Sequence, residues 1–162
     1  MLRGVSVGLL TKLAIVLLLA IGAAACSKNA KTSNLTGNAT PGTVEDFSIN
    51  VGNRVLYTVN SSVLTPEGRS ILDRQAQWLK LYNKYQVTIE GHADERGTRE
   101  FNLALGARRA TSTRNYLVSQ GIAASRMGTI SYGKERPEAV CNADSCWSQN
   151  RRTITALNGG SS

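Results

Sequence analysis

The chain has 162 residues, which is room for one ordinary domain with extensions and too little for two full domains. It carries 19 lysines and arginines against 11 acidic residues, a formal net charge of +8. In a cytosolic protein such a basic balance would suggest nucleic-acid binding, but the export signal described next argues against that function.

The first 25 residues are typical of an export signal rather than of a folded segment. Arg3 and Lys12 provide positive charge, and the 13 residues from Leu13 to Ala25 are uncharged. A membrane-spanning helix needs about 20 apolar residues, so this run is too short to cross a bilayer. A charged start, a short apolar stretch and small residues at its end predict a secretory signal peptide over residues 1–25.

Cys26 directly follows the small residues Gly22 to Ala25. This arrangement matches a bacterial lipobox, in which the residue after the cleavage site is a cysteine that carries diacylglycerol, although Ala23 stands where leucine is commoner. The alternative is an ordinary secreted protein with a cysteine just past its cleavage site. We predict that Cys26 is lipidated and that the chain is anchored in the outer membrane, because Ser27 rather than aspartate comes next.

Residues 26–48 contain few side chains that a core could bury, so they predict a disordered tether behind the lipidated cysteine. From Ile49 onward the pattern becomes globular, and we expect one domain over residues 49–158 and a flexible tail over residues 159–162. Removing Arg3 and Lys12 with the signal leaves 17 basic and 11 acidic residues, a net charge of +6. Anionic lipid, acidic wall peptide or an acidic partner surface suits this charge in an exported protein.

Four strands and two helices are expected within the domain. Alternating and β-branched residues predict strands over residues 54–59, 86–90, 127–132 and 152–157. One helix is expected to begin at Pro66 behind the capping residue Thr65, and a longer one covers residues 98–119 and ends before Gly121. The order β-α-β-α-β-β predicts an α/β fold, an α+β sandwich with two main helices on one face of a mixed sheet.

Cys141 and Cys146 form an even pair in an oxidising compartment. The simplest expectation is a disulfide that closes a short loop, with two free thiols as the alternative. A metal site would need more ligands than this pair and the single histidine, His92. We therefore expect no metal and, apart from the lipid on Cys26, no cofactor.

The segment Gly91–Thr98 combines polar residues and two glycines where a strand passes to a helix. On that helix Asn102, Leu105 and Arg109 follow at positions i, i+3 and i+7, which places them on one stripe. The Asp94 carboxylate and the Arg109 guanidinium are suited to hold a ligand that carries both charges. Their spacing alone does not show that they face the same pocket.

These motifs resemble a known family over nearly all of residues 49–157. The matching positions are Gly91, His92, Ala93, Asp94, Gly97, Asn102, Leu105, Arg109, Ala110 and Asn150-Arg151-Arg152. They resemble the OmpA-like peptidoglycan-binding domain, and residues 91–100, 130–137 and 141–152 resemble its lipid-anchored branch. The resemblance implies a protein that binds the cell wall non-covalently.

The resemblance also implies roles for individual residues. Asp94 would bind the ammonium group of meso-diaminopimelate in the peptidoglycan stem peptide, and Arg109 would bind its carboxylate. Both contacts would be charge-assisted hydrogen bonds, which are stronger than hydrogen bonds between neutral groups. Asn102 and Leu105 would line the same groove. This chain departs from the family at Thr58-Val59-Asn60, where aspartates are common, so only a neutral contact is expected there.

Partners follow from the same resemblance. It implies peptidoglycan, TolB and the other Tol-system proteins, which together link the outer membrane to the cell wall and support envelope integrity and constriction during division. A lipoprotein that acts mainly as a protein-interaction module, without direct wall binding, is the alternative function.

An enzyme is not expected. His92 with Asp94 would suggest a hydrolase only with a suitably placed serine, and Cys141 and Cys146 suit each other better than they suit a thiol mechanism. His92 and Trp147 are expected to be structural. Arg151 and Arg152 either order the edge of the pocket or form a solvated pair.

Overall fold

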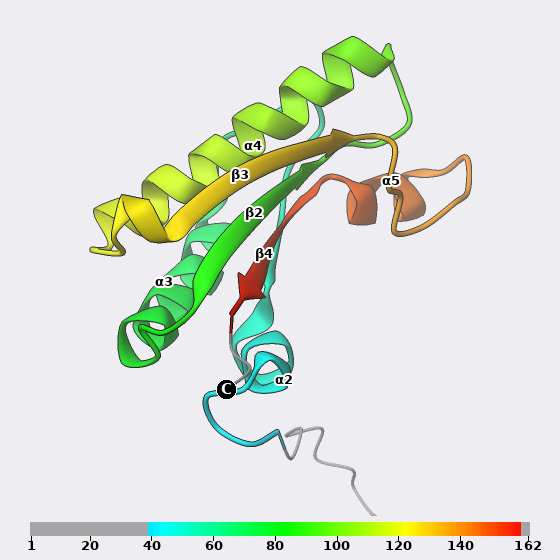
Figure 1. Cartoon of the computed structure of the whole chain (residues 1–162). Coiled ribbons are helices and arrows are strands. Elements are labelled where there is room, and N and C mark those ends of the chain that lie inside the picture. Colours follow the sequence, from blue (N-terminus) through cyan, green and yellow to red (C-terminus); the bar gives the residue numbers. More distant parts are fainter. Residues whose placement is uncertain (1–38, 160–162) are drawn as a thin grey trace, which may run out of the picture. The chain divides into compact units, whose positions relative to one another are not determined.

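The computed structural model describes residues 39–159, which form a mixed four-stranded sheet with two long helices (Figure 1). The strands are β1 (Arg54–Leu56), β2 (Gln86–His92), β3 (Met127–Gly133) and β4 (Arg152–Asn158), in the order β1-β4-β2-β3. β2 and β3 are parallel, whereas β4 is antiparallel to both of its neighbours, β1 and β2. The predicted signal peptide, Cys26, residues 27–38 of the tether and residues 160–162 lie outside the described residues.

The two main helices are α3 (Pro66–Leu81) and α4 (Arg99–Ser119), and each begins after a capping threonine. The hydroxyl groups of Thr65 and Thr98 each accept a hydrogen bond from the backbone N–H three residues later, at 3.0 and 3.2 Å. These bonds satisfy donors that a helix start leaves without an intrahelical partner. Among residues 39–159, no helix combines the length and the apolar character needed to cross a membrane.

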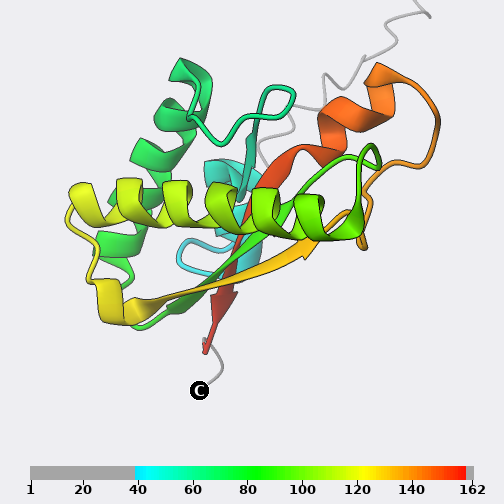
Figure 2. The same cartoon turned by 90° about the horizontal axis from the view of Figure 1, so that it is seen from above.

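Both helices pack on the same face of the sheet. Thr153 of β4 contacts Thr113 of α4 at 3.0 Å, and Thr155 of β4 donates a hydrogen bond to Gln75 of α3 at 2.8 Å. Residues two apart in a strand point to the same face, so α3 and α4 share it. Figure 2 looks down onto α4 with the strands beneath it. The predicted fold class is confirmed.

The hydrophobic core lies between these two layers. Leu72 and Leu79 of α3, Ile89 of β2 and Leu117 of α4 are fully buried. Burying a side chain of this kind contributes about 1.5–3 kcal/mol relative to leaving it exposed. This layer therefore fixes the helices, and the residues they carry, against the sheet.

The core extends into a segment that we predicted to be tether. A short helix, α2 (Val44–Asp46), and a π-helical segment, η1 (Phe47–Gly52), precede β1. Phe47 is fully buried with its ring 4.9 Å from that of Trp78, and the Asp46 carboxylate accepts a hydrogen bond from the Trp78 indole at 2.8 Å. The predicted boundary at residue 49 is therefore too late, because these contacts hold the preceding residues in the domain.

Strand β1 ends at Leu56, three residues earlier than predicted. The next residues turn away from the sheet: the Thr58 and Ser61 carbonyls accept hydrogen bonds from Arg109, and Asn60 has a left-handed backbone with φ of 51°. Such a conformation interrupts an extended strand. Residues 57–65 therefore form a loop between β1 and α3.

A further short helix, α5 (Asp144–Asn150), lies between β3 and β4 and was not predicted. The predicted disulfide between Cys141 and Cys146 is present, with Cα atoms 5.7 Å apart. The buried Asn150 side chain accepts hydrogen bonds from the backbone N–H groups of Glu138 and Ala139, at 2.7 and 3.1 Å. These bonds hold the long connection from β3 to α5 in place.

Candidate functional site

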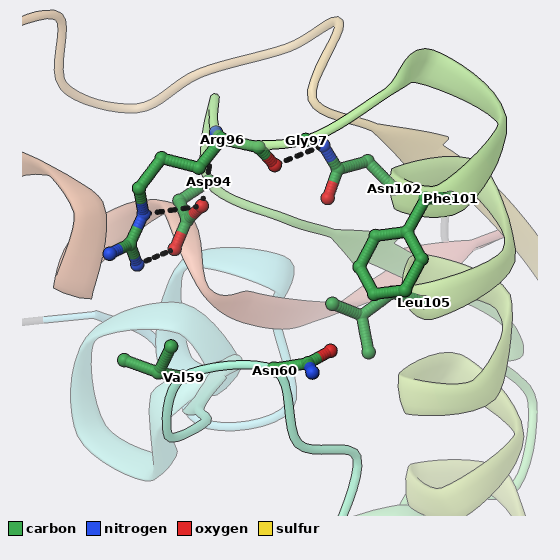
Figure 3. Close-up of a pocket in the computed structure, with 8 residues that line it drawn as sticks. All are labelled: Val59, Asn60, Asp94, Arg96, Gly97, Phe101, Asn102 and Leu105. Carbon is green, nitrogen blue, oxygen red and sulfur yellow. Dashed lines mark hydrogen bonds and ion pairs between the residues drawn. The ribbon is translucent and has the colours of Figure 1, made fainter.

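A pocket of about 270 Å³ opens where β2 passes to α4, beside the loop that follows β1 (Figure 3). Residues from these three segments line it: Val59, Asn60, Asp94, Arg96, Gly97, Phe101, Asn102 and Leu105. Asp94, Asn102 and Leu105, three of the residues predicted to bind a ligand, thus lie in one pocket. Arg109 is not among the lining residues.

Two glycines allow β2 and α4 to meet closely enough to build this pocket. A Cβ atom on Gly91 of β2 would collide with the backbone carbonyl of Gly106 in α4, and a Cβ atom on Gly106 would meet the Gly91 carbonyl. Only glycine fits at such a backbone contact. The close approach brings Asn102 and Leu105 of α4 to the pocket in which Asp94 lies.

The Asp94 carboxylate is nearly buried and is held by two arginines. Arg96 contacts both of its oxygens, Nη2 to Oδ2 at 2.6 Å and Nε to Oδ1 at 3.2 Å, and Arg151 Nη1 lies 3.4 Å from Oδ2. Burial opposes ionisation, but the hydrogen bonds and charge of Arg96, aided by Arg151, outweigh it and lower the pKa of Asp94. The pocket therefore presents an ionised carboxylate at neutral pH.

Helix α5 supports these arginines from outside the pocket. The Arg96 guanidinium lies over the Trp147 ring, 4.2 Å from its centroid, and the Trp147 indole donates a hydrogen bond to Glu95 at 3.0 Å. Arg151 is also bound by Asp144, at 3.1 Å. Trp147 is thus a packing residue, as predicted, and Arg151 orders the edge of the pocket.

Arg109 lies behind the pocket rather than in it. Its side chain is fully buried, and its guanidinium donates hydrogen bonds to the carbonyls of Ser61, His92 and Thr58, at 2.8, 2.8 and 3.1 Å. Burial lowers its pKa to about 10, so it still carries its charge at neutral pH. Arg109 therefore joins the loop after β1 to the end of β2, and one N–H on each terminal nitrogen remains beyond these three bonds.

The α4 side of the pocket is largely apolar. Figure 3 shows Phe101, Asn102 and Leu105 across the pocket from the Asp94–Arg96 pair. The Asn102 side chain donates a hydrogen bond to the Arg96 carbonyl at 2.7 Å, which fixes the turn before α4. Asp94 is the single acidic residue among those that line the pocket, since the loop after β1 contributes only Val59 and Asn60.

His92, which the sequence places two residues before Asp94, does not line the pocket. The His92 imidazole is buried outside the pocket, 3.6 Å from Glu90 and with its ring 5.5 Å from that of Tyr132. Burial and the nearby Arg152 and Arg136 lower the pKa of His92 to about 4. The described residues also contain no cluster of three or more histidine, cysteine or acidic side chains that could hold a metal ion.

Sequence reasoning missed two of the residues that shape the site. Arg96 lies in the segment Gly91–Thr98, but its ion pair with Asp94 depends on how the turn between β2 and α4 folds. Asp144 reaches Arg151 only because α5 forms. The spacing of two between Asp94 and Arg96 was the one available signal, and it is too common in turns to be specific.

The chain matches the family described as the OmpA family over residues 56–152. It is 54% identical over 155 residues to the peptidoglycan-associated lipoprotein of Rhizobium meliloti, covering 93% of this chain and 88% of that protein. It is 51% identical over 154 residues to the Brucella melitensis protein of the same name, covering 91% and 92% of the two chains.

Solved structures give the same result. The crystal structure of the peptidoglycan-associated lipoprotein from Burkholderia pseudomallei matches with a TM-score of 0.68 and 32% identity, covering 74% of this chain and all of that one. The C-terminal domain of Helicobacter pylori MotB, at 16% identity, shares the fold with a TM-score of 0.62 and covers 67% of this chain and 85% of that one. From these matches, this chain belongs to the peptidoglycan-associated lipoproteins of the OmpA family.

Proposed function

We propose that this protein is an outer-membrane lipoprotein, anchored through Cys26, whose domain holds the peptidoglycan stem peptide non-covalently in the Asp94 pocket. The observation that carries the proposal is a nearly buried, ionised carboxylate at an open pocket with an apolar side. The names of its relatives, peptidoglycan-associated lipoproteins, agree with a wall-binding role.

The chemistry of meso-diaminopimelate fits the residues of the pocket. Its side chain is a short run of methylene groups that ends in a carbon bearing both an ammonium and a carboxylate group. In the proposed complex the ammonium binds Asp94 in place of the Arg96 guanidinium, as a charge-assisted hydrogen bond. The methylene groups pack on Leu105 and Phe101.

Arg109 is assigned to the ligand carboxylate, as the family resemblance implies. One N–H on each of its terminal nitrogens is available beyond the three backbone carbonyls. Because Val59 and Asn60 line the pocket and Arg109 does not, this contact requires the loop after β1 to shift. Arg109 therefore has two proposed roles, holding the loop and neutralising the ligand.

The wider role remains part of the proposal. TolB and the other Tol-system proteins are the proposed partners, and their connection to the cell wall would support envelope integrity and constriction during division. The alternative is a lipoprotein that binds other proteins and has no direct contact with the wall.

A pull-down with purified sacculi tests the proposal. The native chain should sediment with sacculi, and an excess of free meso-diaminopimelate should release it. Asp94→Asn removes the negative charge in the pocket and should abolish sedimentation, whereas Glu45→Gln removes one exposed negative charge at the start of the domain and should not. Sedimentation of Asp94→Asn equal to that of the native chain would refute the pocket and favour the protein-interaction module.

A further inference from the structure

A second depression, of about 480 Å³, lies along the outer side of α4. It is lined by Ser62, Ala107, Arg108, Thr111, Ser112 and Asn115, and none of these residues lines the Asp94 pocket. We call it the α4 groove. Its lining offers hydroxyl groups, one amide and one guanidinium group, and it contains no acidic residue.

The α4 groove and the Asp94 pocket are lined by neighbouring residues of the same two segments. Arg108 follows Leu105 by three positions on α4, which places the two side chains about 5–6 Å apart at Cβ on neighbouring turns. Ser62 follows Asn60 by two residues in the loop after β1. The same helix and the same loop therefore line both depressions.

Arg108 differs from the other arginines of this helix because it has no partner within the part of the chain that the structure describes. Arg99 pairs with Glu135 at 3.2 Å, Arg109 donates to three carbonyls, and Arg114 donates to the Met127 carbonyl at 3.1 Å. The Arg108 side chain makes no hydrogen bond or ion pair with residues 39–159 and is exposed. An exposed guanidinium among hydroxyl groups suits an anionic group from outside.

We infer that the α4 groove is a second subsite of the wall ligand, in which Arg108 binds a carboxylate of the stem peptide next to diaminopimelate. This inference rests on the proposed function. An extended peptide advances about 3.3–3.6 Å per residue, so one or two residues span a distance comparable to the separation of about 5–6 Å between the Cβ atoms of Leu105 and Arg108. Ser62, Thr111 and Asn115 supply further hydrogen bonds.

Calorimetric titration with two ligands tests the subsite on the full chain in detergent. Free meso-diaminopimelate fills only the Asp94 pocket, whereas a muropeptide with its stem peptide also extends along α4. Arg108→Gln should weaken muropeptide binding roughly three- to tenfold and leave diaminopimelate binding unchanged. Arg108→Glu should weaken muropeptide binding further. Lys80→Gln, which removes an exposed charge at the end of α3, is the matched control and should change neither affinity.

The outcomes separate this inference from the proposed function. If Arg108→Gln binds both ligands as the native chain does, the groove is not a subsite, and the Asp94 pocket stands. An equal loss for both ligands would also overturn the subsite, because it would show an effect of charge at a distance. If the native chain binds neither ligand, the proposed function fails and the subsite with it.

Discussion

At the scale of single residues, Arg109 carries a charge in a fully buried position and holds three backbone carbonyls. Arg109→Met keeps much of the side-chain length but leaves those carbonyls without their donor. We expect the free energy of unfolding in urea to fall by about 3 kcal/mol or more. Arg108→Met, at the exposed neighbouring position, should change it by less than about 0.5 kcal/mol. A stable Arg109→Met protein that fails to bind diaminopimelate would make Arg109 purely a ligand residue.

The buried His92 predicts a pH dependence of stability. Its pKa is lowered to about 4 in the folded protein, chiefly by burial and then by Arg152 and Arg136, against an ordinary value of 6.5. Between these two values the unfolded chain binds a proton that the folded protein does not, so stability falls as the pH drops from about 6.5 to 4. The loss should be on the order of 3 kcal/mol. Urea unfolding at pH 7 and pH 4.5 measures it, and His92→Leu should lose most of this dependence.

At the scale of elements, the segment before β1 is part of the domain although its composition resembles that of the tether. A chain that starts at residue 49 lacks Phe47 and the Asp46 carboxylate that accepts from Trp78. Removing a buried phenylalanine side chain alone costs about 3–5 kcal/mol. We expect the truncated chain to lose at least this much in thermal or urea unfolding, and a chain that starts at residue 39 to lose little. Equal stability of the two chains would contradict the packing seen for η1.

Helix α5 shows how one short element supports a site on other elements. The disulfide Cys141–Cys146 closes the turn at its start, which should contribute about 2 kcal/mol in the chain-entropy view. Asp144 of this helix forms an ion pair with Arg151, and the Trp147 ring packs against the Arg96 guanidinium. Both arginines in turn form ion pairs with Asp94. The position of the pocket carboxylate therefore depends on a segment more than 45 residues away in sequence.

At the scale of the whole molecule, the net charge and the pocket make different predictions for binding to the wall. At an ionic strength of about 1 M the Debye length is about 3 Å, so attraction through the overall positive charge is screened. Binding through the nearly buried Asp94 should survive with only a several-fold loss in sacculus sedimentation. Complete release by salt, with no effect of free diaminopimelate, would indicate general electrostatic association instead of a pocket.

Much of the fold followed from local patterns. The Thr65 cap and Pro66 at the start of α3, the glycine after α4 and the β-branched residues of the strands act within a few residues. α3, α4, β2, β3 and β4 therefore formed close to where they were predicted. η1 and α5 were missed for a common reason. A single buried aromatic residue and a seven-residue helix have no periodicity that a sequence can show.

The sequence by itself predicted the main helices and strands and the pairing of Cys141 with Cys146, because these depend on local patterns. The gathering of Asp94, Asn102 and Leu105 was implied by the family resemblance, and the close approach of Gly91 to Gly106 brings it about. Only the tertiary structure decided that Arg109 is buried and that Arg108 is exposed. Neighbours on a helix point about 100° apart. The loop after β1 covers Arg109 and leaves Arg108 exposed, and the packing of that loop across α4 is a long-range contact that no local pattern records.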